Sequence, residues 1–465
     1  MAREATDFTR MSQRELYFSF SLVTSLFFLW GFSYGLLDVL NQHFLDIFNL
    51  TKTQTTLLQF AYFVAYLVVA PGAGAFMRRT SYKLGIHCGL GLFSIGAIMF
   101  WPAAHYGYYG MFVAFTFVTA SGLATLEVAA NSYITVLGTP KFSALRLTLA
   151  QGFNGIATVI GPIIAAHAFF NGANKYSLGT VQYVYLAMSL FGCVINVLVF
   201  FAKLPDVQQV VTVVSGVVGE EKATVKGLFR FRRTIFGFIA EFAYVGAQVA
   251  VASFAIFYIT EQPGISPPIS QATASNMFSG CQAVFTAGRF IGVLYLKYVD
   301  PAFALFASGL GLMLFSILTA VLPGKGGIAC LYMIFFFESI CYPVIFSVAT
   351  ADLGTYAKLG AGLIAAGVSG GACWPSMTGA VADRHSTHIA FFIPFMGYVP
   401  LAVYGLVMWV SRSRKYTGKI TIWVSQAPLV VPDAVEKALG VPEGEDIEMP
   451  TIEENKEEVS HVEFR

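Results

Sequence analysis

The chain alternates between long apolar runs and short polar connections. Runs of about 20 mostly apolar residues recur, the length that an α-helix needs to cross the hydrocarbon core of a bilayer. Strands are disfavoured because those of a membrane barrel need only about 9–11 residues. The predicted spanning segments are 19–46, 54–77, 84–103, 108–138, 143–170, 180–202, 234–260, 268–296, 302–322, 327–351, 359–382 and 389–411. The pattern predicts an all-α membrane protein with about twelve transmembrane helices.

Composition supports a polytopic membrane protein and excludes several other classes. The 465 residues are 56% hydrophobic and 12% charged, whereas soluble domains carry about 25% charged residues. A net charge of +2 provides no general attraction to nucleic acid. The six cysteines show no metal-ligand spacing. No nucleotide-binding loop is present either, so ATP is not the expected energy source, and a proton gradient is expected instead. We expect no enzyme activity, no metal and no cofactor.

The longest internal polar stretch, 205–233, divides the chain into two sets of six predicted helices. It is rich in Lys and Arg, and so are the connections expected on the same side of the membrane. The positive-inside rule therefore predicts that both termini are cytoplasmic, with the plasma membrane as the expected location. The expected organisation is a cytoplasmic N-terminus (1–18), an N-terminal six-helix bundle (19–203), a cytoplasmic central loop (204–233), a C-terminal six-helix bundle (234–412) and a cytoplasmic tail (413–465) predicted to be disordered.

A single carboxylate, Glu127, stands inside the apolar run 122–131. A charge at the centre of a bilayer costs about 2.5–3.5 kcal/mol on insertion scales, so such residues usually have a function. One interpretation is that Glu127 faces an internal cavity and binds and releases a proton as a solute crosses. The alternative is a protonated carboxyl whose hydrogen bonds hold helices together.

Polar residues recur at helical spacing on several predicted helices. Side chains three, four or seven positions apart share a helix face, so each set forms a polar stripe. The stripes are Asp38 with Asn41 and Gln42, Glu127 with Asn131, Gln151 with Asn154 and Thr158, Glu241 with Tyr244 and Gln248, and Glu338 with Tyr342, while Asn276 and Arg289 share one further helix. Hydrogen bonding between helices explains any single amide equally well, but stripes on several helices favour a polar cavity.

These side chains suit a site for a sugar and a proton. Amides supply the donors and acceptors that hydroxyls need, and aromatic rings supply flat apolar faces. Asp38 and Glu127 are the predicted proton-coupling carboxylates, because a dry cavity favours the protonated form and water favours the charged form. Arg289 needs a partner, and Glu241 and Glu338 are candidates for a structural charge cluster with it. A lipid or a loop carbonyl is the alternative partner.

Several stretches resemble one known family, in order along essentially all the helices. They are FFLWGFSYGLLDVLNQHF (27–44), SYKLGI (81–86), FWPAA (100–104), LEVAANSYITVLG (126–138), RLTLAQGFN (146–154), FAYVGAQ (242–248), GRF (288–290), YPVIFS (342–347) and DLGT (352–355). On these residues the chain is identified as a fucose permease-like member of the fucose–galactose–glucose:proton symporters, within the major facilitator superfamily. It departs from the family pattern at 33–37, Arg78, Glu241 and Glu338.

The resemblance implies two six-helix bundles in a V-shaped arrangement and alternating-access symport of a monosaccharide with protons. The family's essential acids correspond to Asp38 and Glu127, and its sugar-contacting amides correspond to Gln151 and Asn154. With the stripes above, the predicted substrate-binding residues are Asn131, Gln151, Asn154, Gln248 and Asn276. Expected partners are the sugar, protons and the lipid bilayer, with no nucleic acid, and we expect a functional monomer.

Two other functions are compatible with the sequence. The run 152–162 is rich in Gly and similar to the fifth helix of drug–proton antiporters, which favours an antiporter or exporter of another small solute. A non-transporting sugar sensor that signals through its tail is the second alternative.

Overall fold

The computed structural model describes residues 12–48, 52–170, 178–202, 204 and 224–424. Within these ranges the regular elements are helices, and the one β feature is an isolated bridge between Val299 and Trp423. The first half contains α1 (Gln13–Phe48), α2 (Lys52–Arg79), α3 (Tyr82–Ile98), α4 (Phe100–Tyr106), α5 (Tyr109–Val136), a 3-10 turn η2 (Pro140–Phe142), α6 (Ser143–Phe170) and α7 (Gly179–Phe201).

The second half repeats this helical design with more interruptions. It contains α9 (Val225–Leu228), α10 (Arg232–Thr260), α11 (Gln271–Tyr295), α12 (Pro301–Val321), α13 (Gly324–Glu338), α14 (Cys341–Thr350), η4 (Gly354–Tyr356), α15 (Ala357–Ala366), η5 (Gly367–Ala372), α16 (Trp374–Arg384), α17 (Thr387–Ala390) and α18 (Phe392–Thr417). Ten helices of the described ranges are long and apolar enough to cross a membrane. With α6 and the interrupted segment from α15 to α16, the described residues contain about twelve spanning segments, as the hydrophobic pattern predicts.

Three predicted helices are interrupted, for local reasons. The segment 84–103 breaks at Met99, just before Pro102, and 327–351 breaks between Glu338 and Cys341, just before Pro343. Proline lacks the backbone donor that an uninterrupted helix requires. The segment 359–382 passes through the glycine-rich 3-10 turn η5. A stretch of 3-10 helix in the middle of a longer helix often marks a hinge.

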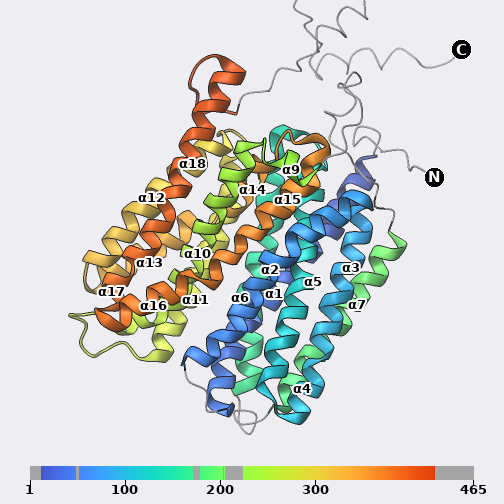
Figure 1. The fold of residues 1–465 in the computed structure, drawn as a ribbon. Helices are drawn as coiled ribbons and strands as arrows, with labels where there is room; N and C mark the ends of the chain where they lie inside the picture. Colours follow the sequence, from blue (N-terminus) through green and yellow to red (C-terminus); the bar gives the residue numbers. More distant parts are fainter. Residues whose placement is uncertain (1–11, 49–51, 171–177, 203, 205–223, 425–465) are drawn as a thin grey trace, which may run out of the picture.

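The helices form two bundles, one from α1 to α7 and one from α10 to α18, that lie side by side (Figure 1). Within the first bundle α1 packs on α6 and α3 packs on α5 and α7, while in the second α18 packs on α10 and α12. The bundles meet where α2 contacts α15 and η5 and where α6 contacts α11 and α14. The start of α1 and the end of α18 lie at the same end of the molecule, which we call the terminal end.

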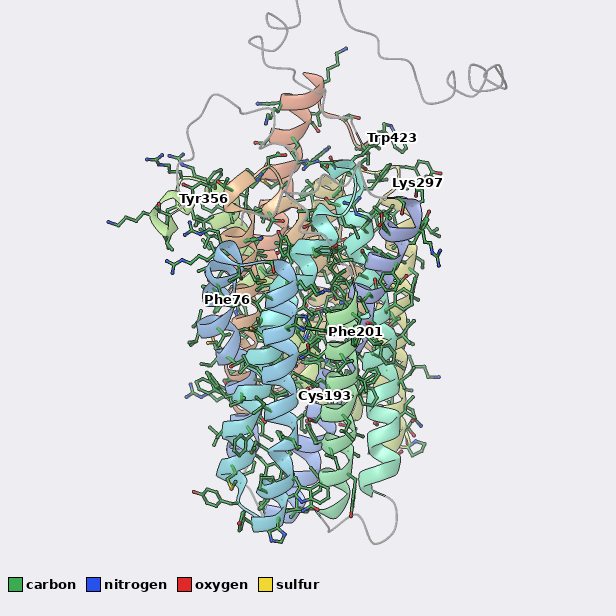
Figure 2. The ribbon with its side chains drawn as sticks, turned by 90° about the vertical axis from the view of Figure 1, so that its right-hand side faces the viewer. Phe76, Cys193, Phe201, Lys297, Tyr356 and Trp423 are labelled. Carbon is green, nitrogen blue, oxygen red and sulfur yellow. The ribbon has the colours of Figure 1, made fainter. Side chains whose placement is uncertain are left out.

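Large apolar side chains cover the outer surface of both bundles. Phe201 on α7 is 77% exposed and Leu294 on α11 is 70% exposed. Figure 2 labels Phe76, Cys193 and Phe201 on helices of the first bundle, and all three side chains are exposed. Such an extensive apolar surface is typical of helices that contact lipid.

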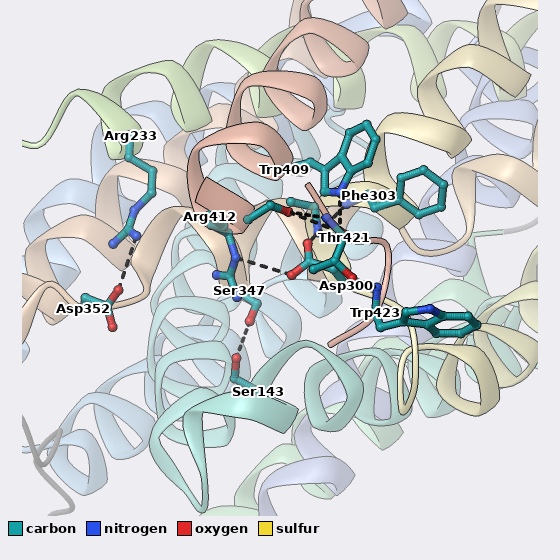
Figure 3. A network of polar contacts seen from close by, with 12 residues as sticks. Ser143, Arg233, Asp300, Phe303, Ser347, Asp352, Trp409, Arg412, Thr421 and Trp423 are labelled. Carbon is teal, nitrogen blue, oxygen red and sulfur yellow. Dashed lines mark hydrogen bonds and ion pairs between the residues drawn. The ribbon is translucent and has the colours of Figure 1, made fainter. Parts of the chain in front are cut away.

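Close contacts join the two bundles at the terminal end. Gly74 of α2 faces Gly362 of α15, and a Cβ atom added to Gly74 would lie 2.4 Å from the Lys358 carbonyl oxygen. The Lys358 ammonium donates to the Met77 carbonyl oxygen at 3.1 Å. The hydroxyls of Ser143 and Ser347 share a hydrogen bond of 2.6 Å, seen in Figure 3. Small residues therefore let the backbones of α2 and α15 touch, and polar bonds hold this end closed.

The chain remains ordered beyond the last membrane helix. α18 ends at Thr417, beyond the domain boundary expected at 412, and the following residues pack on the connection between α11 and α12. The Trp409 indole donates to the Thr421 carbonyl oxygen at 2.7 Å, and the Asp300 backbone N–H donates to the Ile422 carbonyl oxygen at 2.9 Å (Figure 3). The disorder predicted for 413–465 is therefore wrong for residues 413–424, because their contacts to the α11–α12 connection hold them in place. Residues 425–465 lie outside the described ranges.

Candidate functional site

A cavity lies between the two bundles, and side chains of both form its wall. The first bundle contributes Trp30, Tyr34, Tyr62, Phe63, Tyr66, Asn154 and Thr158. The second contributes Val245, Gln248, Val249, Ala252, Gln282, Phe285, Arg289, Phe335, Glu338, Tyr342 and Val368. The wall combines aromatic rings, amides, one cation and one carboxyl group, as expected of a site for a small polar solute with an apolar face.

The aromatic part of the wall comes mainly from α1 and α2. The ring centroids of Tyr34 and Tyr62 are 6.0 Å apart, and those of Tyr62 and Tyr66 are 5.6 Å apart. The Trp30 indole donates to the Tyr62 hydroxyl at 3.2 Å, and its ring lies 6.3 Å from that of Tyr342. These contacts fix the rings, so their faces are available without further ordering.

Glu127 is hydrogen-bonded across the boundary between the bundles. Its side chain is 3% exposed, and its Oε1 accepts a hydrogen bond from the Tyr342 hydroxyl of α14. The Asn131 amide, one helical turn further along α5, donates to the same hydroxyl at 2.9 Å. Because Tyr342 lines the cavity, it connects the acid of the first bundle to both the second bundle and the cavity.

Arg289 also joins the two bundles. Its Nη1 donates to the Gln151 carbonyl oxygen at 2.6 Å and to the Asn154 side-chain oxygen at 3.1 Å, both on α6. Its Nε donates to the Ser339 carbonyl oxygen at 3.3 Å. It makes no ion pair with Glu241 or Glu338, and carbonyl oxygens take the place of the acid partner considered from the sequence.

The two remaining buried acids have different surroundings. Glu338 lines the cavity, and its Oε1 accepts a hydrogen bond from the Tyr398 hydroxyl at 2.5 Å. Glu241 is fully buried, does not line the cavity and has no hydrogen-bond partner for either carboxyl oxygen among the described residues. Its methylene groups pack against Gly367 in η5.

The predicted substrate-binding residues fall into three groups. Asn154 and Gln248 line the cavity. Asn131 and Gln151 are buried beside it, and the Gln151 amide has no hydrogen-bond partner among the described residues. Asn276 is exposed on α11 and does not line the cavity.

Asp38 lies on α1, but its side chain is outside the described part of the structure. Sequence reasoning missed the aromatic residues of α2 in the cavity wall, Tyr62, Phe63 and Tyr66. Tyr62 and Tyr66 are four positions apart and therefore share a helix face, and this spacing could have indicated an aromatic stripe on α2. In the described ranges no cluster of His, Cys, Asp and Glu could hold a metal ion.

The family model of the Major Facilitator Superfamily matches residues 22–374. The chain belongs to the major facilitator superfamily. This transporter is 35% identical over 400 residues to a glucose/galactose transporter of Brucella abortus biovar 1 (strain 9-941), covering 85% of this chain and 95% of that one. It is 31% identical over 432 residues to the L-fucose-proton symporter of Escherichia coli (strain K12), covering 89% and 97%.

Among solved structures, this transporter is similar to a crystal structure of the superfamily member FucP in the outward conformation. The TM-score is 0.75 at 29% identity, and the match covers 85% of this chain and 99% of that one. The relatives named here are transporters and are matched over nearly their full length. The resemblance identified from the sequence motifs is therefore confirmed.

Proposed function

We propose that this protein is a proton-coupled symporter of a fucose-, galactose- or glucose-type monosaccharide that works by alternating access. The hydrogen bond from Tyr342 to Glu127 carries this proposal, because it connects a buried acid to the solute cavity and crosses the boundary between the two moving bundles. The names of the relatives, a glucose/galactose transporter and an L-fucose-proton symporter, support the substrate class and the coupling ion.

Glu127 and Asp38 are the proposed proton-coupling carboxylates. When the bundles rock, the Tyr342 hydroxyl moves with the second bundle, so Glu127 loses a donor that favours its ionised form. Entry of water from one side then changes its affinity for a proton. The protonation of Glu127 thus depends on the conformation of the transporter, and this dependence is what couples proton movement to sugar movement.

The sugar occupies the cavity between the bundles in this proposal. The Asn154 and Gln248 amides bond hydroxyls directly, and Tyr34 and Tyr62 offer ring faces to the C–H face of the sugar. Asn131 donates to the Tyr342 hydroxyl of the wall, and the Gln151 backbone carbonyl oxygen accepts from Arg289. Asn276 is left outside the site because it is exposed and does not line the cavity.

The cellular context is proposed on charge and composition. The two bundles are those expected at 19–203 and 234–412. The basic connections between their helices support a cytoplasmic location for both termini. We take the plasma membrane as the location. The terminal end is then cytoplasmic, and its contacts are those of a conformation closed to the cytoplasm. The transporter functions as a monomer, needs no cofactor and is driven by the proton gradient.

Uptake into proteoliposomes with an imposed proton gradient tests the symport. Adding fucose, galactose or glucose outside is expected to alkalinise the external medium, and a protonophore is expected to abolish accumulation. Uptake that ignores the protonophore would overturn proton coupling. Acidification on adding the solute would instead support an antiporter.

Glu127→Gln tests the assigned acid. The amide fills the same volume but cannot exchange a proton, so sugar binding and exchange should survive while uphill accumulation fails. Full accumulation in this variant would remove Glu127 from the mechanism. A thermal-shift screen against monosaccharides identifies the sugar, because a ligand stabilises the form it binds.

A further inference from the structure

We propose that Glu338 is the hydroxyl-binding acceptor of the second bundle, whose free carboxyl oxygen receives a hydrogen bond from one specific hydroxyl of the sugar. This inference rests on the proposed sugar transport and names a residue that determines which sugar is bound. It assigns to Glu338 a role different from the structural charge cluster considered from the sequence.

The position of Glu338 is fixed by two tyrosines from two other helices. The Tyr398 hydroxyl of α18 donates to Oε1 at 2.5 Å, and the Tyr244 hydroxyl of α10 donates to the Glu338 backbone carbonyl oxygen at 2.7 Å. Glu338 ends α13, at the interruption before α14. Hydrogen bonds therefore fix both the backbone and the carboxyl group of Glu338. A binding group that is fixed in this way is preorganised for its ligand.

The second carboxyl oxygen has no donor. Oε2 of Glu338 is buried without a hydrogen-bond partner among the described residues, and the residue lines the cavity. Burial of an acceptor without a donor is unfavourable, so buried acceptors are normally satisfied by protein, water or ligand. A sugar hydroxyl in the cavity supplies the missing donor.

The nearby cation does not take this role. Arg289 lines the same cavity, but its Nη1 is bonded to the Gln151 carbonyl oxygen and the Asn154 side chain, and its Nε is bonded to the Ser339 carbonyl oxygen. It makes no ion pair with Glu338. The Arg289 side chain is therefore engaged by these oxygens and leaves the second carboxyl oxygen of Glu338 unoccupied.

Glu241 provides a matched control within the same bundle. It is also a fully buried glutamate without a partner for its free oxygens, but it packs against Gly367 and does not line the cavity. A general effect of removing a buried acid should appear in both Glu241→Gln and Glu338→Gln. An effect through the sugar should appear only in Glu338→Gln.

The test is a binding comparison with purified full-length protein. Affinities for the best-bound hexose and for its series of single-position deoxy analogues are measured by calorimetry for the wild type, Glu338→Gln, Glu338→Ala and Glu241→Gln. The wild type should lose about 10- to 100-fold in affinity for one analogue, because the buried carboxyl oxygen is then left without a donor. Glu338→Gln should lose a similar factor for the parent hexose, because its amide presents a donor in place of the free oxygen. In Glu338→Ala, the parent hexose and that analogue should bind with equal affinity, because the acceptor is gone.

The outcomes separate this inference from the proposed function. If no hexose binds the wild type, the proposed function fails. If hexoses bind the wild type and Glu338→Gln equally well, or if Glu241→Gln weakens binding as much, the role of Glu338 is overturned. Unchanged affinity in Glu338→Gln with an altered proton-to-sugar ratio would make Glu338 a proton carrier and would also overturn it. Normal thermal unfolding of Glu338→Gln establishes that the variant is folded.

Discussion

The contact between α2 and α15 predicts how one methyl group changes the conformational equilibrium. In Gly74→Ala the new Cβ would lie 2.4 Å from the Lys358 backbone carbonyl oxygen. Ordinary contact requires about 1 Å more, and neither backbone can yield alone. Overpacking of this kind costs about 1–3 kcal/mol. The cost applies only while the terminal end is closed, so the population open at this end should rise about 5- to 150-fold.

Alkylation of a buried cysteine measures this shift. Ser347 is 4% exposed and contacts Ser143 of the other bundle, so a Ser347→Cys thiol should react with a water-soluble maleimide only when the terminal end opens. The six native cysteines are first replaced by serine or alanine. Alkylation should then be about 5- to 150-fold faster in Gly74→Ala than in the parent.

Gly72→Ala is the matched control for this measurement. A Cβ atom there meets nothing within 4 Å, although Gly72 lies on the same helix two positions earlier. Both variants gain the same helix propensity, about 1 kcal/mol, so the difference between them isolates the contact with α15. Equal alkylation rates in Gly72→Ala and Gly74→Ala would refute the steric account.

Three further outcomes follow from the structure. Asp300→Ala should lower the free energy of unfolding by about 1–2 kcal/mol because Asp300 caps α12, whereas Asp300→Asn should lower it less; equal thermal unfolding of the wild type and the Ala variant would contradict this. Truncation after Val424 should leave thermal stability and uptake unchanged. Truncation after Gly418 should lower thermal stability, because it removes the strand-like contacts to the α11–α12 connection. Equal thermal stability of the two truncated proteins would argue against a stabilising role of these contacts. Tyr342→Phe removes the donor to Glu127 and should reduce the accumulation ratio in vesicles with sugar binding retained, so undiminished accumulation would count against the bond.

The hydrophobic pattern predicted the fold because it reports directly on how each segment meets lipid. A run of about 20 apolar residues has few alternatives to a spanning helix in a bilayer. The predicted segments agree with the observed helices to within six residues, with the largest differences at the start of α1 and the end of α18, apart from the interruptions at Met99, at Ser339–Ile340 and in η5. Periodicity also identified the polar faces, and Asn154 and Gln248 do line the cavity.

The sequence by itself determined which helix faces are polar, and only the tertiary structure decided which polar groups meet. Glu127 and Tyr342 are 215 positions apart, and Glu338 and Tyr398 are 60 apart, so no local spacing relates them. Whether a polar residue faces the cavity or the outside depends on how its helix is rotated against its neighbours. That rotation separates Asn276, which is exposed on α11, from residues of the same helix that line the cavity. The rotation of each helix is set by its packing against the other helices, and this packing exists only once the helices have assembled.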